Sequence, residues 1–187
     1  MYNEVIKKLL RKYEIIPEDL VVMYLMKAYG LSRNMAEQAV FAACRSRAAY
    51  KRGDYLMRVP YLDANSTTQK KSLAFRIVIE FLPESDDFET GYSPWLASFI
   101  KDGNLIQVCY IERGMELLTS MMVGEKPVPV EDRSSIKRLL IVEPGCDLSK
   151  IKKAGFSHIC TIDGSYNIAI LAHFDDVEEA WRDVPAR

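Results

Sequence analysis

One stretch near the amino terminus constrains this chain most, because it joins two helical patterns through a glycine turn and ends in a basic segment. Residues 15–62 read IIPEDLVVMYLMKAYGLSRNMAEQAVFAACRSRAAYKRGDYLMRVPYL. Pro17, Glu18 and Asp19 are typical of a first helical turn, since proline presets φ and carboxylates favour the positive end of the helix dipole. Apolar residues then recur at helical spacing until Gly30 interrupts them. A glycine turn of this kind is what a helix-turn-helix needs.

The second helix of this stretch has a small apolar face and a polar face. Ser32 is expected to cap its first turn. The small face would let the helix pack closely against its partner, and it consists of Ala36, Ala39, Val40 and Ala43. The polar face has residues spaced four, three and four apart, namely Asn34, Gln38, Phe41 and Arg45. Asn and Gln pair bidentately with adenine, and Arg with guanine or phosphate, which suits a DNA major groove. An ordinary solvated helix is the alternative, because many surface helices carry these residue types.

The segment after the second helix is strongly basic. Within fourteen residues five cations stand against one acid, Asp54, and they are Arg45, Arg47, Lys51, Arg52 and Arg58. Residues 55–59 alternate like a short strand, and residues 52–54 form a turn that would be the tip of a hairpin. Cations on such a hairpin would lie along DNA phosphates. The order helix, turn, helix, hairpin predicts a winged helix-turn-helix that contacts duplex DNA, with a protein-interaction module of the same shape as the alternative.

The predicted DNA-contacting residues come from the second helix and the basic segment. They are Arg33, Asn34, Gln38, Arg45, Arg47, Lys51, Arg52 and Arg58. The charge distribution agrees with this prediction, because residues 1–79 hold 14 Lys and Arg against 7 Asp and Glu, a balance of +7. Residues 80–187 hold 11 against 19, a balance of -8. Such an asymmetry suggests that one half meets a polyanion, although two solvated surfaces can differ as much without a ligand.

The rest of the chain alternates helical and strand patterns. Residues 3–13 predict a basic amphipathic helix, residues 68–82 an apolar helix and residues 83–91 an acidic loop. Beyond them the pattern predicts strands at 94–100, 105–111, 138–142, 158–162 and 167–172, helices at 114–123, 147–154 and 175–181, and a proline-rich loop at 126–132. We therefore expect an α+β or α/β chain with two domains, a winged helix-turn-helix at 1–65 and an α/β domain with a mixed sheet at 66–187.

The order of elements in the second half resembles the restriction-endonuclease-like fold. With the winged helix in front, the whole chain resembles the replication-relaxation type of protein found on plasmids and conjugative elements. This resemblance implies a DNA-binding protein of a bacterial mobile element, acting in replication, transfer or transcription control. The resemblance covers the order of the elements along nearly the whole chain.

Nucleases of that fold hold Mg²⁺ with a carboxylate on the first hairpin strand and an acid-x-lysine pair on the second. The matching positions here are Ser93 or Pro94 and residues 107–109, Gln-Val-Cys, none of which is a carboxylate or a lysine. Glu80 on the preceding helix is a lone acid. We therefore expect a degenerate domain without catalytic residues, so that the protein is not an enzyme. The alternative is a metal-dependent nuclease whose active residues lie elsewhere.

The remaining chemistry in the sequence is sparse. Four cysteines form no CxxC pair, and only His158 and His173 are available to complete a metal site, so we expect no bound metal or other cofactor. No apolar run approaches the eighteen residues of a membrane span. No secretory signal is evident, so we expect a cytoplasmic protein with reduced thiols. The expected partner is double-stranded DNA, and a homodimer is a further possibility because symmetric dimers are common among such proteins.

Overall fold

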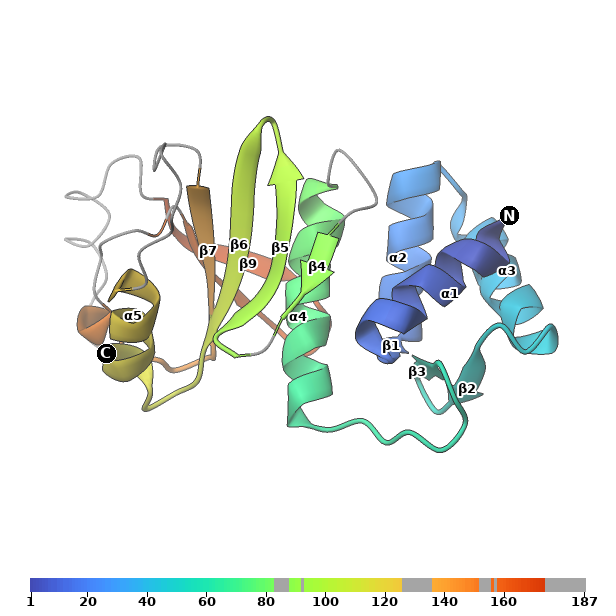
Figure 1. The fold of residues 1–187 in the computed structure, drawn as a ribbon, viewed down its shortest axis with the longest axis horizontal. Helices are drawn as coiled ribbons and strands as arrows, with labels where there is room; N and C mark the ends of the chain where they lie inside the picture. Colours follow the sequence, from blue (N-terminus) through green and yellow to red (C-terminus); the bar gives the residue numbers. More distant parts are fainter. Residues whose placement is uncertain (83–87, 92, 126–135, 152–155, 157, 174–187) are drawn as a thin grey trace. The chain divides into compact units, whose positions relative to one another are not determined.

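The computed structural model describes residues 1–82, 88–91, 93–125, 136–151, 156 and 158–173. The chain divides into two compact units, Met1–Leu82 and Pro83–Arg187, and each is described here by itself (Figure 1). Across the described residues helices and strands are both abundant, and the larger sheet is mixed, so the predicted α+β class is confirmed. None of the described helices is long and apolar enough to cross a membrane.

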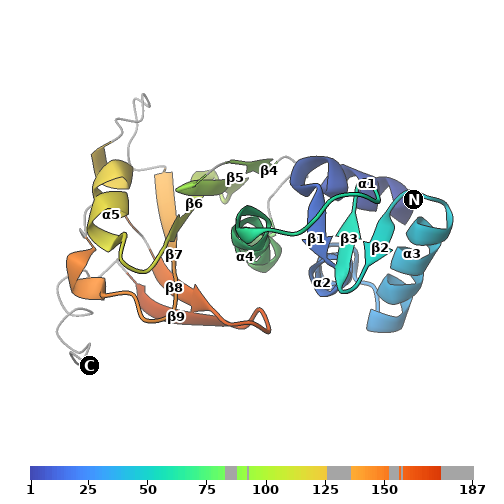
Figure 2. The ribbon, with the colours of Figure 1, turned by 90° about the horizontal axis from the view of Figure 1, so that it is seen from below.

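The first unit combines helices with a small antiparallel sheet. Its elements are α1 (Tyr2–Tyr13), β1 (Ile15–Pro17), α2 (Glu18–Tyr29), α3 (Arg33–Arg45), β2 (Tyr50–Arg52), β3 (Tyr55–Met57) and α4 (Ser66–Phe81). The strands lie in the order β1-β3-β2, so that β3 pairs with both neighbours (Figure 2). The helix predicted at 3–13, the two helices around the glycine turn and the hairpin that follows them are confirmed.

Two glycines make the tight connections of this unit possible. Gly30 ends α2 in the left-handed conformation, with φ at 66°, and Gly53 lies in the β2–β3 turn with φ at 56°. Residues with a Cβ adopt this region at a cost, so glycine is favoured at both turns. At the start of α3, the Ser32 side chain accepts a hydrogen bond from the Met35 amide at 3.3 Å, which confirms the predicted cap.

Strand β1 was not predicted. The sequence pattern places Pro17 in the first helical turn, whereas in the structure Ile15–Pro17 is extended and Pro17 caps α2 with φ at -55°. Ile15 and Ile16 are buried and pair with Met57 and Leu56 of β3. Two β-branched side chains in succession fit a pleated strand, so burial against β3 overrides the helix-start signal of the residues that follow.

Helix α4 belongs to the first unit, which differs from the predicted domain boundary at 65/66. Phe75 is fully buried, and its ring centroid lies 4.7 Å from that of Tyr13 and 5.7 Å from that of Tyr24. Asn65 caps the helix by accepting a hydrogen bond from the Thr68 amide at 2.9 Å. The aromatic contacts with α1 and α2 place α4 in the core of the first unit, and the boundary therefore lies at 82/83.

The second unit is built around a six-stranded mixed sheet. Its elements are β4 (Phe88–Thr90), β5 (Trp95–Lys101), β6 (Asn104–Ile111), α5 (Glu116–Glu125), β7 (Ile136–Val142), the 3-10 helix η2 (Leu148–Lys150), β8 (His158–Ile162) and β9 (Ile168–His173). The strands are ordered β4-β5-β6-β7-β8-β9, with β6, β7 and β8 parallel and the other pairs antiparallel. The predicted mixed sheet and its five strands are confirmed.

One face of this sheet carries the apolar core of the second unit. Val123 of α5 packs there with strand residues that include Cys109, Leu140 and Ile159. Hydrophobic burial of this kind fixes the α5 crossover between β6 and β7, which are parallel and need a long connection. The helix therefore covers the carboxyl-terminal half of β6 and β7 on that face (Figure 1).

Three predictions for this unit differ from the structure or fall outside it. The expected acidic loop at 83–91 contains strand β4, because Phe88 is buried and pairs with Phe99 of β5. The expected helix at 147–154 is only the 3-10 turn η2, capped by Asp147, within its described part. Residues 126–132 and 175–181, predicted as a loop and a helix, lie outside the described residues.

Candidate nucleic-acid interface

One face of helix α3 is buried in the first unit, and the opposite face is exposed to solvent. Ala36, Val40 and Ala43 are buried, and their small side chains pack the helix closely against α1 and α2. The opposite side contains Asn34, Gln38, Phe41 and Arg45, all of which are exposed. The sequence prediction of a buried small face and an exposed polar face on this helix is therefore confirmed.

The polar face contains one internal hydrogen bond and one large apolar ring. The Gln38 Nε2 group donates to Asn34 Oδ1 at 3.2 Å, which orients both amides along the helix. Phe41, one turn further on, has 65% of its surface exposed. Phe41 was predicted on this face without a role, although an exposed aromatic ring at the centre of a polar helix face is a signal of contact.

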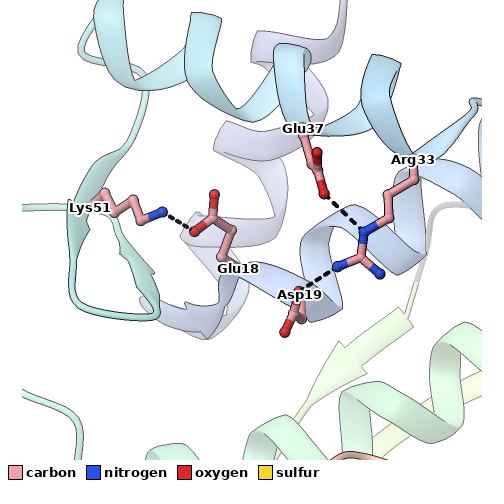
Figure 3. A network of polar contacts seen from close by, with 5 residues as sticks. All are labelled: Glu18, Asp19, Arg33, Glu37 and Lys51. Carbon is pink, nitrogen blue, oxygen red and sulfur yellow. Dashed lines mark hydrogen bonds and ion pairs between the residues drawn. The ribbon is translucent and has the colours of Figure 1, made fainter.

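Arg33, at the first turn of α3, is paired with two acids. Its Nε atom donates to Glu37 at 2.9 Å and its terminal nitrogen contacts Asp19 of α2 at 3.3 Å (Figure 3). These contacts raise the pKa of Arg33, chiefly through the hydrogen bond to Glu37. The Glu37 pair was readable from the sequence, because residues four apart share a helix face. The Asp19 contact depends on the tertiary fold.

The cations of the hairpin are also paired. Lys51 of β2 forms an ion pair with Glu18 at the start of α2 (Figure 3). Arg52 contacts Asp63 at 2.6 Å, and Arg58, just after β3, contacts Glu14 at 3.1 Å. Each of these partners lies in the first unit, so the hairpin is less positive than its cations alone suggest.

Arg45 and Arg47 differ from the other predicted cations. Both side chains are exposed at the carboxyl end of α3, and neither joins an ion pair within the described part of the chain. Arg47 adopts a left-handed backbone conformation with φ at 58°, immediately after the helix ends. This end of α3 therefore presents two guanidinium groups to solvent that pair with no carboxylate of the described residues.

The second unit has a polar row on the α5 side of its sheet. The strand registers place Glu89 beside Ser98, Ser98 beside Gln107, and Gln107 beside Arg138, so the four side chains cross four strands on one face. A cavity of about 110 Å³ opens at this row, bounded by Glu89, Ser98, Gln107 and Trp95 among others. The Arg138 guanidinium lies 5.5 Å from the centre of the Trp95 ring.

The polar row can be compared with the carboxylates that a nuclease site of this fold requires. It contains a single carboxylate, and Glu80 is engaged elsewhere by Arg76 at 2.9 Å and by Lys27 at 3.2 Å, contacts that lower its pKa. Nucleases of the type considered need two carboxylates to hold Mg²⁺. The described residues also contain no group of three His, Cys, Asp or Glu side chains placed to bind a metal ion.

The thiols of the second unit are poor nucleophiles at neutral pH. Burial raises the pKa of Cys160 to about 12 and that of Cys109 well above its usual range. The pKa of Cys146 is raised to about 11 by burial and by the neighbouring Glu116 carboxylate. Since the thiolate is the reactive form, these cysteines behave as small apolar residues.

Comparison with known proteins adds no family to this description. No family model matches the sequence, and no curated protein matches it.

Proposed function

We propose that this chain is a DNA-binding protein whose first unit is a winged helix-turn-helix that docks on duplex DNA through α3 and the β2–β3 hairpin. The observation that carries the proposal is the open face of α3, where Asn34, Gln38 and Arg45 are uncovered while the small apolar face of the helix is buried. A recognition helix needs both features, because it must be fixed to its own domain and still enter a groove.

The topology of the first unit supports the same proposal. The element order α1, β1, α2, α3, β2, β3 with sheet order β1-β3-β2 sets the hairpin directly after the recognition helix, as a wing requires (Figure 2). Residues 1–82 hold 14 Lys and Arg against 8 Asp and Glu, a balance of +6, which favours a polyanionic partner.

In this proposal the second unit is a restriction-endonuclease-like module without a working metal site. Its antiparallel strands β4, β5 and β6, the α5 crossover and the parallel β7 support that assignment. The single carboxylate of its polar row argues against hydrolysis. A role on a bacterial mobile element, in replication, transfer or transcription control, is proposed from the resemblance in element order alone.

The test is a fluorescence-anisotropy titration of a labelled duplex, repeated across a series of salt concentrations. We expect binding at about 50 mM salt that weakens as salt rises, since phosphate contacts release counterions. Arg45→Ala and Arg47→Ala should each reduce the salt slope by about one. Lys27→Ala removes the same charge from α2 and should leave the slope unchanged.

Two outcomes would refute the proposal. Absence of duplex binding at low salt would exclude DNA as the partner. An equal loss of affinity from Lys27→Ala and Arg45→Ala would mean that only net charge is sensed, and that α3 is not the docking element.

A protein-docking module is the second candidate, and one observation favours it. Phe41 and Met35 expose 65% and 54% of their surfaces on α3, and exposed aromatic and Met side chains are enriched at protein interfaces. The same titration distinguishes the two, because a docking module would bind no duplex.

A further inference from the structure

The open face of α3 presents an amide and an aromatic ring side by side, and these two residue types suit particular base pairs. Phe41 lies between Gln38 and Arg45, three residues after one and four before the other, at the centre of the face. Its ring is 65% exposed, so it contributes nothing to the core. Among base edges, the partner that suits such a ring in the major groove is the thymine C5-methyl group.

The amide of Gln38 retains the full set of atoms for an adenine contact. One of its two N–H groups donates to Asn34 Oδ1 at 3.2 Å. The second N–H and the Oε1 atom remain, which are the donor for adenine N7 and the acceptor for adenine N6. The bond to Asn34 fixes the amide plane in advance, so Asn34 acts as a positioning residue for Gln38.

The spacing of the two side chains matches neighbouring base pairs. Three residues of an α-helix advance by about 4.5 Å, and successive base pairs of DNA are separated by about 3.4 Å. A ring at position 41 therefore reaches the base pair next to the one that Gln38 contacts. Glu37, the nearby acid on α3, lies one turn before Phe41, and its carboxylate is engaged by Arg33 at 2.9 Å (Figure 3).

We infer that α3 reads a short A·T step in the major groove, with Gln38 on adenine N7 and N6 and Phe41 on the thymine methyl group. This inference rests on the proposed DNA-binding function and adds the class of base pair to it. It makes Phe41 a specificity-determining residue and leaves Arg45 and Arg47 to bind phosphate.

The experiment changes one chemical group of the DNA bases at a time. Three labelled duplexes of equal length are compared, one of alternating A·T pairs, one with deoxyuridine in place of thymidine, and one with 7-deazaadenosine in place of adenosine. The first substitution deletes the methyl group and the second deletes N7. Each duplex is titrated with the full chain and with the Phe41→Ala, Gln38→Ala and Asn34→Ala variants.

Each combination of a modified duplex and a protein variant has its own expected affinity. Loss of the methyl group should weaken the unmodified protein about three- to five-fold, the effect of one buried methyl group. Loss of N7 should weaken it about ten-fold. Phe41→Ala should bind the thymidine and deoxyuridine duplexes equally and still discriminate 7-deazaadenosine, and Gln38→Ala should show the reverse. Asn34→Ala should keep both effects but reduce the discrimination of 7-deazaadenosine.

Met35→Ala provides the matched control. Met35 is an exposed apolar residue of the same helix but lies to the side of the face. Its removal should leave the discrimination of deoxyuridine unchanged. Because Phe41, Gln38 and Met35 are all exposed, these substitutions test binding rather than folding, which circular dichroism of each variant checks.

The outcomes separate this inference from the proposed function. No binding of any duplex would overturn both. Binding that is equal on all three duplexes would leave DNA binding in place and overturn the inference. Unchanged DNA affinity of Phe41→Ala on every duplex would also overturn it, and would assign the ring to a protein partner.

Discussion

Phe75→Ala tests whether α4 is part of the first unit. Phe75 is fully buried between two aromatic rings, with centroids 4.7 Å and 5.7 Å away. Truncating a buried phenylalanine costs about 3–5 kcal/mol, and each aromatic pair contributes about 0.5–1.5 kcal/mol of that loss beyond area burial. A unit of this size is stable by about 4–12 kcal/mol, so the variant should lose a large part of the stability of the first unit.

Two spectroscopic signals separate the units in a denaturant titration of the full chain. Helices α1 to α4 lie in the first unit, so far-ultraviolet circular dichroism reports mainly on it. Trp95 lies in β5 of the second unit, so its fluorescence reports on that unit. We expect Phe75→Ala to shift the circular dichroism midpoint strongly and the fluorescence midpoint little.

Phe41→Ala is the matched control for this experiment, because it removes the same side chain from a position that is 65% exposed. Its effect on stability should stay within about 0.5 kcal/mol. If Phe75→Ala instead shifted the fluorescence transition alone, or cost no more than Phe41→Ala, α4 would belong with the second unit, as a boundary at 65/66 requires.

Three further predictions follow from single contacts. Glu18→Gln removes the acid partner of Lys51 and frees this cation for a DNA phosphate. DNA affinity at low salt, measured by anisotropy, should therefore rise, and the slope of log affinity against log salt concentration should steepen by about 0.9. An unchanged slope would exclude Lys51 from the interface. Backbone hydrogen bonds lower the pKa of Glu116, first that of Gly114, then that of Glu116 itself and that of the Asp147 amide, which donates to the carboxylate at 3.1 Å. The ionised Glu116 carboxylate therefore stabilises the fold at pH values above the ordinary carboxyl pKa, and this stability is lost as the pH falls through the lowered pKa. Glu116→Gln should lower the free energy of unfolding at neutral pH by about 1–2 kcal/mol. It should also reduce the dependence of that free energy on pH in the acid range, measured by tryptophan fluorescence. Gly103 has φ at 71° in the β5–β6 turn, so Gly103→Ala should cost about 1 kcal/mol in the same fluorescence assay, and a neutral result would contradict the turn geometry.

The elements of this fold were predictable where the local pattern and the tertiary structure agree. The helix after Ser32 has a cap, a small apolar face and a polar face, so its start and its faces were predicted. The β5–β6 hairpin has an Asp-Gly turn, and its strands were predicted to within one residue. Strands β1 and β4 were missed because each has only three residues and no hairpin turn to mark it, unlike β2 and β3, which are equally short but flank the predicted turn at 52–54. The extended conformation of β1 depends on β3, which is distant in the sequence, whereas β4 pairs with β5, the next strand along the chain.

The same distinction applies to the candidate interface. The exposed face of α3 followed from helical spacing alone, and the Arg33–Glu37 pair could have been read in the same way. The pairing of Lys51 with Glu18 and of Arg58 with Glu14 could not, because each joins residues brought together by the β1–β3 ladder and the hairpin. A count of basic residues therefore overstated the positive charge available to a polyanion.

These acid partners shape how the first unit would use its charge. Exposed ion pairs contribute little stability, so a DNA phosphate can replace Glu18 beside Lys51 at small cost. The displaced carboxylate nevertheless stays near the phosphate and repels it, which cancels part of the gain. Non-specific binding should therefore be weaker than the number of cations suggests, with Arg45 and Arg47 supplying most of it. A larger share of the affinity of the proposed complex then comes from contacts to base edges, which are the contacts that we propose for the exposed amide of Gln38 and the exposed ring of Phe41.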